Sequence, residues 1–237
     1  MFDILTTPKV KSTIDLSRIR LHSLQSLVTD ADTASMNIKN GMTVGTSGFT
    51  RAGDSKAVLA SVARRAEIES MKITLVTGAS LGQDTDAKLV QAGALYKRMP
   101  FQVDTTLRRA INNGEVYFID QHLSETAELE QNGHLPKVDV AVIEAVMITE
   151  DGGIVPTTSV GNSLTFAEQA EKIIVEINLS VPESLFGVHD IHSSGYYPNK
   201  KPFNITKVSD RIGDTSIKVD PSKIVGIVFT NEPDSPA

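Results

Sequence analysis

The chain of 237 residues is 40% hydrophobic and 22% charged, which is ordinary for a globular protein and supplies enough apolar side chains for a sizeable core. Its formal net charge is -6 and its basic residues form short pairs rather than a stripe, so nucleic acid is not expected as a partner. It contains no cysteine, which excludes disulfides, thiolate metal sites and a cysteine nucleophile.

No membrane or targeting signal is evident. The longest apolar run, Val138 to Ile148, is interrupted by Asp139 and Glu144, whereas a membrane-spanning helix needs about 20 mostly apolar residues. The first five residues contain no basic region followed by an apolar stretch, so no secretory signal is expected. We therefore expect a cytoplasmic protein that does not enter a membrane.

The first part of the chain predicts an arm followed by alternating helices and strands. The first eleven residues show no clear period, and we assign residues 1–17 to a loose arm. Residues 15–40 are mostly helical in pattern, and residues 42–45 form a short strand that runs into a glycine turn. Asp54 and Ser55 are good N-cap residues, and apolar residues from 58 to 63 share one helical face. Residues 72–77 are expected to be a buried strand ended by Gly78.

The same alternation continues to the last apolar segment. Further helices are predicted at residues 86–91, 105–113, 124–131 and 166–171, and Gly114 has the place of a C′ residue. Further strands are predicted at residues 116–119, 138–148, 172–177 and 224–230. A stretch rich in proline, serine and asparagine covers residues 181–204.

Near-continuous apolar strands that alternate with helices predict an α/β fold, an open and mostly parallel sheet with helices on both faces. Residues 18–231 are expected to form one domain. Residues 232–237 are polar and rich in proline, so they are expected to start a linker to a second domain.

The strongest candidate site is the loop Gly45-Thr46-Ser47-Gly48-Phe49 between a predicted strand and helix. Small residues there let backbone N–H groups approach a ligand, and a helix amino terminus favours negative charge. Such a loop can hold a phosphate or an acyl-transfer oxyanion, or it can be a tight turn that needs glycine. It matches neither the Walker loop nor G-x-G-x-x-G, which disfavours nucleotide hydrolysis and standard dinucleotide binding.

A second candidate is Val160-Gly161-Asn162-Ser163, in the segment that follows the most apolar strand. Ligands of open α/β sheets bind beyond the carboxyl ends of the strands, so this segment could present backbone and amide donors. Alternatively, Ser163 is a helix N-cap. Earlier in the same segment, Asp151-Gly152-Gly153 predicts a hairpin-like turn.

Two further sets of residues have side chains that could bind a metal or act in catalysis. His189, Asp190 and His192 lie within four positions, but no other ligand completes a metal site, so no metal is expected and structural histidines are favoured. Glu144 interrupts an apolar strand, and burial would raise its pKa, so it is either catalytic or a structural acceptor. No serine lies in a G-x-S-x-G elbow.

Four motifs occur in the order and spacing of the acetyl-CoA hydrolase/transferase family. They are residues 44–50 (VGTSGFT), 75–80 (LVTGAS), 148–163 and 187–191 (GVHDI), with further matches at residues 100–101 and 210–213. The chain therefore resembles the amino-terminal half of this family from about Arg18 to Asn231. The family includes the succinyl-CoA:acetate and propionyl-CoA:succinate CoA-transferases.

The resemblance implies two similar open α/β domains of the CoA-transferase fold, which sugar-phosphate isomerases share. It also implies covalent catalysis in which a glutamate attacks an acyl-CoA thioester and then carries CoA as a glutamyl thioester. That glutamate belongs to the carboxyl-terminal domain, so the nucleophile is not expected in this chain, and Glu144 and Glu150 are not candidates. Coenzyme A is then a substrate, and no cofactor is expected to be permanently bound.

The same resemblance sets the expected partners. They are acyl-CoA, a small carboxylate, and a second CoA-transferase domain or subunit, with a homo-oligomer as the expected assembly. One departure from the family is Gly53-Asp54-Ser55-Lys56, where many relatives have a Tyr-Pro-Lys stretch; it puts contacts of this loop to CoA in question. The alternatives are a non-catalytic binding protein derived from this fold, and an isomerase-like enzyme with a carboxylate and a lysine in one pocket, for which the sequence shows no convincing pair.

Overall fold

The computed structural model describes residues 14–193, 195, 198, 200 and 202–235, so most of the predicted arm lies outside the described residues. The described chain starts with two 3-10 helices, η1 (Leu16–Arg18) and η2 (His22–Leu27), followed by α1 (Ala31–Ser35). The mostly helical pattern of residues 15–40 is therefore realised as short pieces. No helix in the described ranges is both long and apolar enough to cross a membrane.

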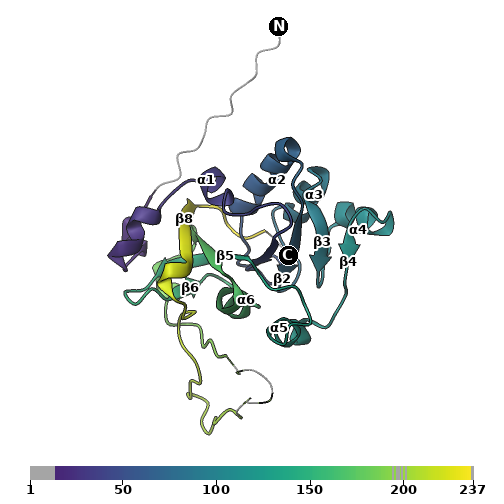
Figure 1. Ribbon diagram of the computed structural model, residues 1–237. Helices are drawn as coiled ribbons and strands as arrows, with labels where there is room; N and C mark the ends of the chain where they lie inside the picture. Colours follow the sequence, from purple (N-terminus) through teal and green to yellow (C-terminus); the bar gives the residue numbers. More distant parts are fainter. Residues whose placement is uncertain (1–13, 194, 196–197, 199, 201, 236–237) are drawn as a thin grey trace.

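A sheet of eight strands forms the centre of the described chain (Figure 1). Its order is β4 (Tyr117–Phe118), β3 (Leu95–Met99), β2 (Ile73–Thr77), β1 (Thr43–Thr46), β5 (Val140–Ile148), β7 (Lys172–Asn178) and β8 (Ile224–Thr230), with β6 (Ile154–Pro156) paired to β5. The β5–β6 pair is antiparallel and the other pairs are parallel. The predicted fold class is confirmed, and so is the hairpin-like turn at residues 151–153.

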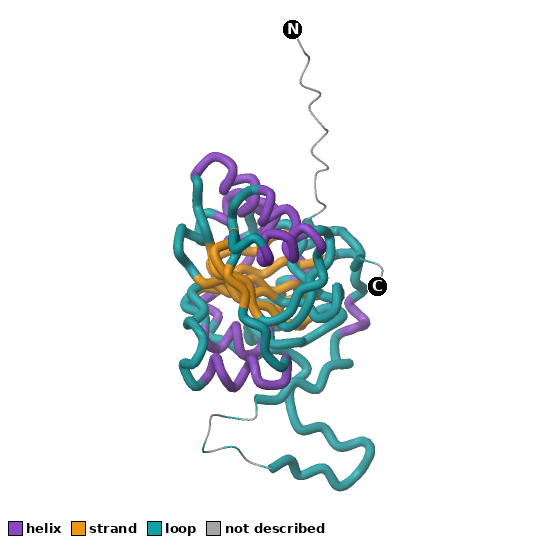
Figure 2. Tube along the Cα trace, turned by 90° about the vertical axis from the view of Figure 1, so that its right-hand side faces the viewer, coloured by secondary structure: helices purple, strands orange, loops and turns teal. Residues whose placement is uncertain are grey.

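Helices cover both faces of the sheet, as the edge-on view shows (Figure 2). One face packs against α2 (Val58–Glu69), α3 (Thr85–Gln91) and α4 (Thr105–Asn112). The other packs against α6 (Ser163–Gln169), beside which lies α5 (Leu123–Gln131). Successive β5 residues face opposite sides, since Val142 belongs to the first core cluster and Ile143 to the second. A strand buried on both faces explains the near-continuous apolar pattern.

Strands β3 and β6 were not predicted from the sequence. Strand β3 contains Lys97 and Arg98, which break an apolar pattern, and yet Arg98 is fully buried. Its guanidinium is bound by both carboxylate oxygens of Asp86, at 2.8 and 3.1 Å, and donates to the Thr77 hydroxyl at 2.9 Å. A buried arginine is tolerated when its charge and donors are matched in this way.

Candidate functional site

The chain reverses its direction of travel across the sheet between β1 and β5. From β1 it proceeds outward through β2, β3 and β4, and it then returns to the opposite side of β1 as β5. Parallel sheets of this kind bind ligands beyond the carboxyl ends of the strands at such a switch point. The predicted loop segment Gly45–Phe49 lies there: its first two residues end β1, and the rest begins the connection to Gly53, here called the glycine loop (residues 47–53).

Most side chains of the predicted loop are engaged in the fold, and one faces solvent. The Thr46 hydroxyl donates to the Val142 carbonyl at 3.2 Å, and the Ser47 hydroxyl accepts from the Glu144 N–H at 2.8 Å, so both are used to hold β5. Gly45 lies against Phe166, where an added Cβ would be 2.7 Å from the ring. Phe49 is 45% exposed and is the side chain of this stretch that faces solvent.

Gly48 has a structural reason for being glycine. Its φ is 124°, and a Cβ there would lie 2.7 Å from the Cβ of Asp54. A side chain at this position would therefore disturb the turn itself, whatever the loop binds. Substituting Gly48 thus tests the turn, and other positions are needed to test ligand contact.

The two predicted candidate segments lie side by side. A Cβ placed on Gly161 would be 3.3 Å from the Gly48 carbonyl oxygen, and one placed on Gly78 would be 2.8 Å from the same atom. Three loops, which follow β1, β2 and β6, therefore meet at the switch point. Within the second segment Val160 and Asn162 are half-buried, Gly161 is exposed and Ser163 is buried.

A cluster of charged side chains, most of them buried, packs against these loops. The Lys56 ammonium donates to Glu144 Oε2 at 2.6 Å, to the Asp54 carbonyl at 2.9 Å and to Asp234 Oδ1 at 3.0 Å. Glu144 also accepts from the Thr157 hydroxyl at 2.6 Å and from the Asn178 amide at 3.0 Å. The side chains of Lys56 and Glu144 are 0% exposed, which supports the structural-acceptor interpretation of Glu144.

The protonation states of this cluster follow from burial and from its excess of carboxylates. Burial opposes charge on Lys56, but Glu144 and Asp54 raise the pKa of Lys56 above its usual value. Burial raises the pKa of Glu144 to about 7, with the charge of Lys56 opposing the shift. Burial also raises the pKa of Asp54. The three acceptors around its ammonium indicate a charged Lys56, so partial protonation of Glu144 near neutral pH relieves the excess negative charge.

A second carboxylate, Glu176 of β7, caps α2. It accepts from the Ser55 hydroxyl at 2.6 Å and from the backbone N–H groups of Lys56, Ala57 and Val58 at 2.7, 3.1 and 2.7 Å. The prediction that Asp54 and Ser55 cap this helix is therefore wrong, because Ala57 is the N-cap residue and makes no side-chain cap. A carboxylate at a helix amino terminus is favourable, and here a distant strand supplies it.

The sequence did not reveal the pairing of Lys56 with Glu144. A lysine and a carboxylate in one place was the condition for the isomerase-like alternative, and the structure provides such a pair. Both side chains are buried and fully bonded, however, so the pair is closed to a substrate in this structure. The available signals were the carboxylate inside an apolar strand and a lysine just after the glycine loop.

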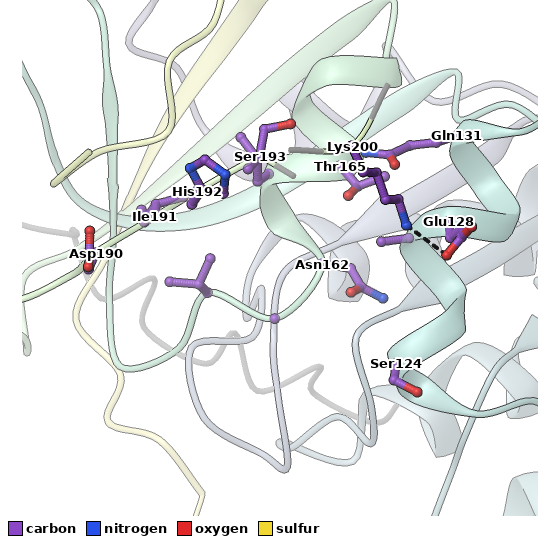
Figure 3. A pocket seen from close by; sticks show the side chains of 14 residues that line it. Ser124, Glu128, Gln131, Asn162, Thr165, Asp190, Ile191, His192, Ser193 and Lys200 are labelled. Atoms are coloured by element: carbon purple, nitrogen blue, oxygen red, sulfur yellow. Dashed lines mark hydrogen bonds and ion pairs between the residues drawn. The ribbon is translucent and has the colours of Figure 1, made fainter. Parts of the chain in front are cut away.

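A polar cavity of about 350 Å³ opens beside Gly161 and Asn162 (Figure 3). Residues of α5, including Ser124 and Glu128, form one wall, and the segment from Asp190 to Ser193 forms another. Lys200 reaches into it and donates to Glu128 at 2.8 Å. Its size lies within the range of small-molecule sites, about 300–1,000 Å³.

Asn162 brings a buried, unpaired hydrogen-bond donor to the lining of this cavity. Its side-chain nitrogen is buried and has no hydrogen-bond partner among the described residues. Although Asn162 is the N-cap residue of α6, its side chain makes no capping bond. Buried donors are nearly always paired, so an unpaired donor that lines a cavity indicates a ligand group or a water as its partner.

The histidine segment is used structurally. His189 Nε2 lies 3.0 and 2.9 Å from the carbonyl oxygens of Pro156 and Thr157, and His192 Nδ1 lies 3.1 Å from that of Ile212. Asp190 accepts from the Gly213 N–H at 2.8 Å. Within the described ranges, no group of three or more histidines, aspartates or glutamates is arranged to hold a metal ion.

Glu130 on α5 is an uncompensated buried carboxyl group. It is 4% exposed, and neither of its oxygens has a hydrogen-bond partner within the described structure. Burial raises its pKa to about 8. Its protonated form therefore contributes stability that is fully present below the ordinary pKa of about 4.5 and is lost as the pH rises through about 8.

Replacing Glu130 with glutamine is expected to stabilise the protein increasingly between pH 5 and pH 8. The gain should approach about 3–6 °C in melting temperature per pH unit, because each unit corresponds to about 1.4 kcal/mol. Thermal unfolding across this pH range measures it. Glu125→Gln, an exposed change on the same helix, is the matched control. Parallel pH profiles for Glu130→Gln and the unchanged chain would contradict a buried titrating group.

Comparison with known proteins identifies relatives along nearly the whole chain. Residues 21–229 match the family model described as the acetyl-CoA hydrolase/transferase N-terminal domain. The succinyl-CoA:acetate CoA-transferase of Clostridium kluyveri is 42% identical over 219 residues, which are 92% of this chain and 41% of that protein. The acetyl-CoA hydrolase of Schizosaccharomyces pombe is 41% identical over 223 residues, 90% of this chain and 43% of that protein.

Solved structures share the fold at low sequence identity. RipA from Yersinia pestis superposes with a TM-score of 0.64 at 15% identity, over 92% of this chain and 45% of that one. The 4-hydroxybutyrate CoA-transferase of Porphyromonas gingivalis gives a TM-score of 0.54 at 19% identity, over 91% of this chain and 42% of that one. The chain thus spans somewhat under half the length of these relatives.

Proposed function

Since the chain belongs to the acetyl-CoA hydrolase/transferase family as its amino-terminal domain, we propose that it forms the amino-terminal half of an enzyme that moves CoA between small carboxylic acids or hydrolyses acetyl-CoA. The observation that carries the proposal is the match over residues 21–229 to enzymes whose names specify these reactions. In this proposal residues 18–231 are the domain and residues 232–237 begin a linker.

The proposed chemistry needs a nucleophile from the other half. A glutamate there attacks the acyl-CoA carbonyl, giving a mixed anhydride and CoA thiolate. The thiolate then attacks the glutamyl carbonyl of the anhydride, which forms a glutamyl-CoA thioester and releases the donor acid as a carboxylate. This half contributes the scaffold, the loop Gly45–Phe49 at the switch point and the segment Val160–Ser163 beside the cavity. The closed Lys56–Glu144 pair has a supporting role.

A covering partner is compatible with the side chains exposed at the strand ends. Phe49 follows β1, Phe101 follows β3, and Phe186 and Val188 follow β7; they are 45%, 43%, 38% and 63% exposed. Exposed apolar side chains in the segments that follow these strands suit an interface with a second domain. We further propose a homo-oligomer that uses acyl-CoA and a small carboxylate. A cytoplasmic location is compatible with the absence of cysteine.

The test is turnover with and without a second half. Residues 1–237 alone are expected to show no thiol release from acetyl-CoA and no CoA exchange between succinyl-CoA and acetate. Adding the carboxyl-terminal half of the Clostridium kluyveri relative should produce turnover that depends on both chains. Turnover by the purified 237 residues alone would contradict the proposal and return Glu144 to consideration. A complex that forms and binds acyl-CoA without turnover would favour a non-catalytic binding protein.

A further inference from the structure

Residues 232–235, here called the strap, lie across the carboxyl ends of the strands and are bonded on both sides. The Glu232 carbonyl accepts from the Asn178 amide at 2.7 Å and from the Ser180 hydroxyl at 3.1 Å. At the other end, the Ser235 hydroxyl accepts from the Gln83 N–H at 2.8 Å. The strap therefore connects the end of β7 with the loop that precedes α3.

Asp234, in the middle of the strap, is bound by three donors of different kinds. Its Oδ1 accepts from the Gly53 backbone N–H at 3.0 Å and from the Lys56 ammonium at 3.0 Å. Its Oδ2 accepts from the Thr158 hydroxyl at 2.6 Å. A cation, an N–H and a hydroxyl that converge on two oxygens are complementary to an ionised carboxylate.

The Asp234 carboxyl group is ionised in this environment. Burial opposes its charge, but the hydrogen bonds from Thr158, Lys56 and Gly53 hold the pKa of Asp234 below its usual value. The side chain is 24% exposed, whereas that of Lys56 is 0% exposed. The carboxylate thus lies at the surface end of the buried cluster and closes Lys56 from solvent.

Two of the three donors, Lys56 and Gly53, are held by contacts that do not involve Asp234. Lys56 is fixed by Glu144 and by the Asp54 carbonyl. Gly53 has a φ of 67°, and a Cβ on it would lie 2.8 Å from the Ser159 hydroxyl, so its backbone packs against the segment that carries Thr158. The geometry is therefore expected to persist when the carboxylate is removed.

We propose that Gly53, Lys56 and Thr158 form a carboxylate-binding site, which Asp234 occupies within the same chain. This occupancy makes Asp234 a positioning residue for the glycine loop, because Gly53 is the last residue of that loop and Lys56 follows it by three. That the glycine loop matters for activity rests on the proposed function. The carboxylate-binding site rests only on the hydrogen bonds of Asp234.

The experiment removes the carboxylate and returns it as a small molecule. Asp234→Ala deletes a group that formate reproduces in size and charge. The variant is expected to melt about 3–10 °C lower, because charged hydrogen bonds are lost. Its Gly53 amide should exchange hydrogen faster, while amides of β2 are unaffected. Sodium formate should restore both quantities in the variant, whereas sodium chloride at equal ionic strength and neutral formamide should not.

Two further variants make the result decisive. Glu232→Ala is the matched control, since that carboxylate makes no hydrogen bond or ion pair within the described residues and only its backbone is used. Glu232→Ala should have the melting temperature of the unchanged chain, and formate should not change it. Thr158→Val combined with Asp234→Ala should weaken the formate response, since one donor is lost.

The proposal is overturned if Asp234→Ala leaves the melting temperature and Gly53 exchange unchanged, or if formate restores no more than formamide does. Should Asp234→Ala unfold, Asp234→Asn keeps the shape and removes the charge. It must then melt below the unchanged chain with faster Gly53 exchange, and normal values would overturn the proposal. All of these measurements use the 237 residues and none of them measures turnover. A negative result therefore does not contradict the proposed acyl-CoA function, and a negative turnover result does not contradict the carboxylate-binding site.

Discussion

Replacing Lys56 with methionine is expected to lower the free energy of unfolding by about 3–5 kcal/mol, because it leaves the buried carboxylate of Glu144 without its cation. Glu144 would keep only the Thr157 and Asn178 hydrogen bonds, at 2.6 and 3.0 Å. Urea denaturation at neutral pH measures the loss. The loss should shrink as the pH falls, because protonation of Glu144 removes the unpaired charge; burial raises its pKa to about 7 even against the charge of Lys56, and removing Lys56 raises it further.

The sign of this pH effect follows from the raised pKa. In the unchanged chain, stability that depends on protonated Glu144 is fully present below the ordinary value of about 4.5 and is lost as the pH rises through about 7; in Lys56→Met the loss is displaced to higher pH, because the opposing charge of Lys56 is gone. Lys137→Met is the matched control, because Lys137 and Glu171 form an exposed pair, 60% and 65% exposed, worth about 0–1 kcal/mol. Lys56→Met with Glu144→Gln should recover much of the loss. A Lys56→Met cost no larger than that of Lys137→Met would show that the pair does not stabilise the fold.

Replacing Asn162 with alanine in the two-half enzyme is expected to reduce kcat/KM by about 100- to 1,000-fold while the melting temperature stays nearly unchanged. The side-chain nitrogen has no partner among the described residues, so its removal breaks no hydrogen bond of the fold. If the amide binds the acyl-CoA, its loss appears in turnover alone. Steady-state kinetics and thermal unfolding of the same variant measure the two effects.

The control for Asn162 is an asparagine remote from the cavity. Asn113 is exposed and donates to Glu115 at 3.0 Å, so Asn113→Ala should leave turnover unchanged. Normal turnover of Asn162→Ala would remove the segment Val160–Ser163 from the proposed site. Loss of turnover together with a large drop in melting temperature would show that Asn162 supports the fold instead.

Local sequence pattern was sufficient for the elements whose burial is uniform. Strands β5, β7 and β8 are mostly apolar because both of their faces are covered, and a strand of this kind can be predicted without knowing its neighbours, even though Glu144 and Glu176 interrupt two of them. The pattern failed at β3, where Arg98 is buried only because Asp86, twelve residues earlier, neutralises it. The order of the motifs also sufficed to identify the family, which the match over residues 21–229 confirms.

The sequence by itself thus determined the fold class, the family and the two loops proposed for the site, since these depend on the spacing of small and apolar residues along the chain. Only the tertiary structure decided that Lys56 meets Glu144, that Glu176 caps α2 and that Asp234 binds beside Gly53. Each of these contacts joins residues 88 or more positions apart. Their proximity follows from the strand order, which places β5 beside β1 and β7 beside β5, and no local periodicity encodes that order.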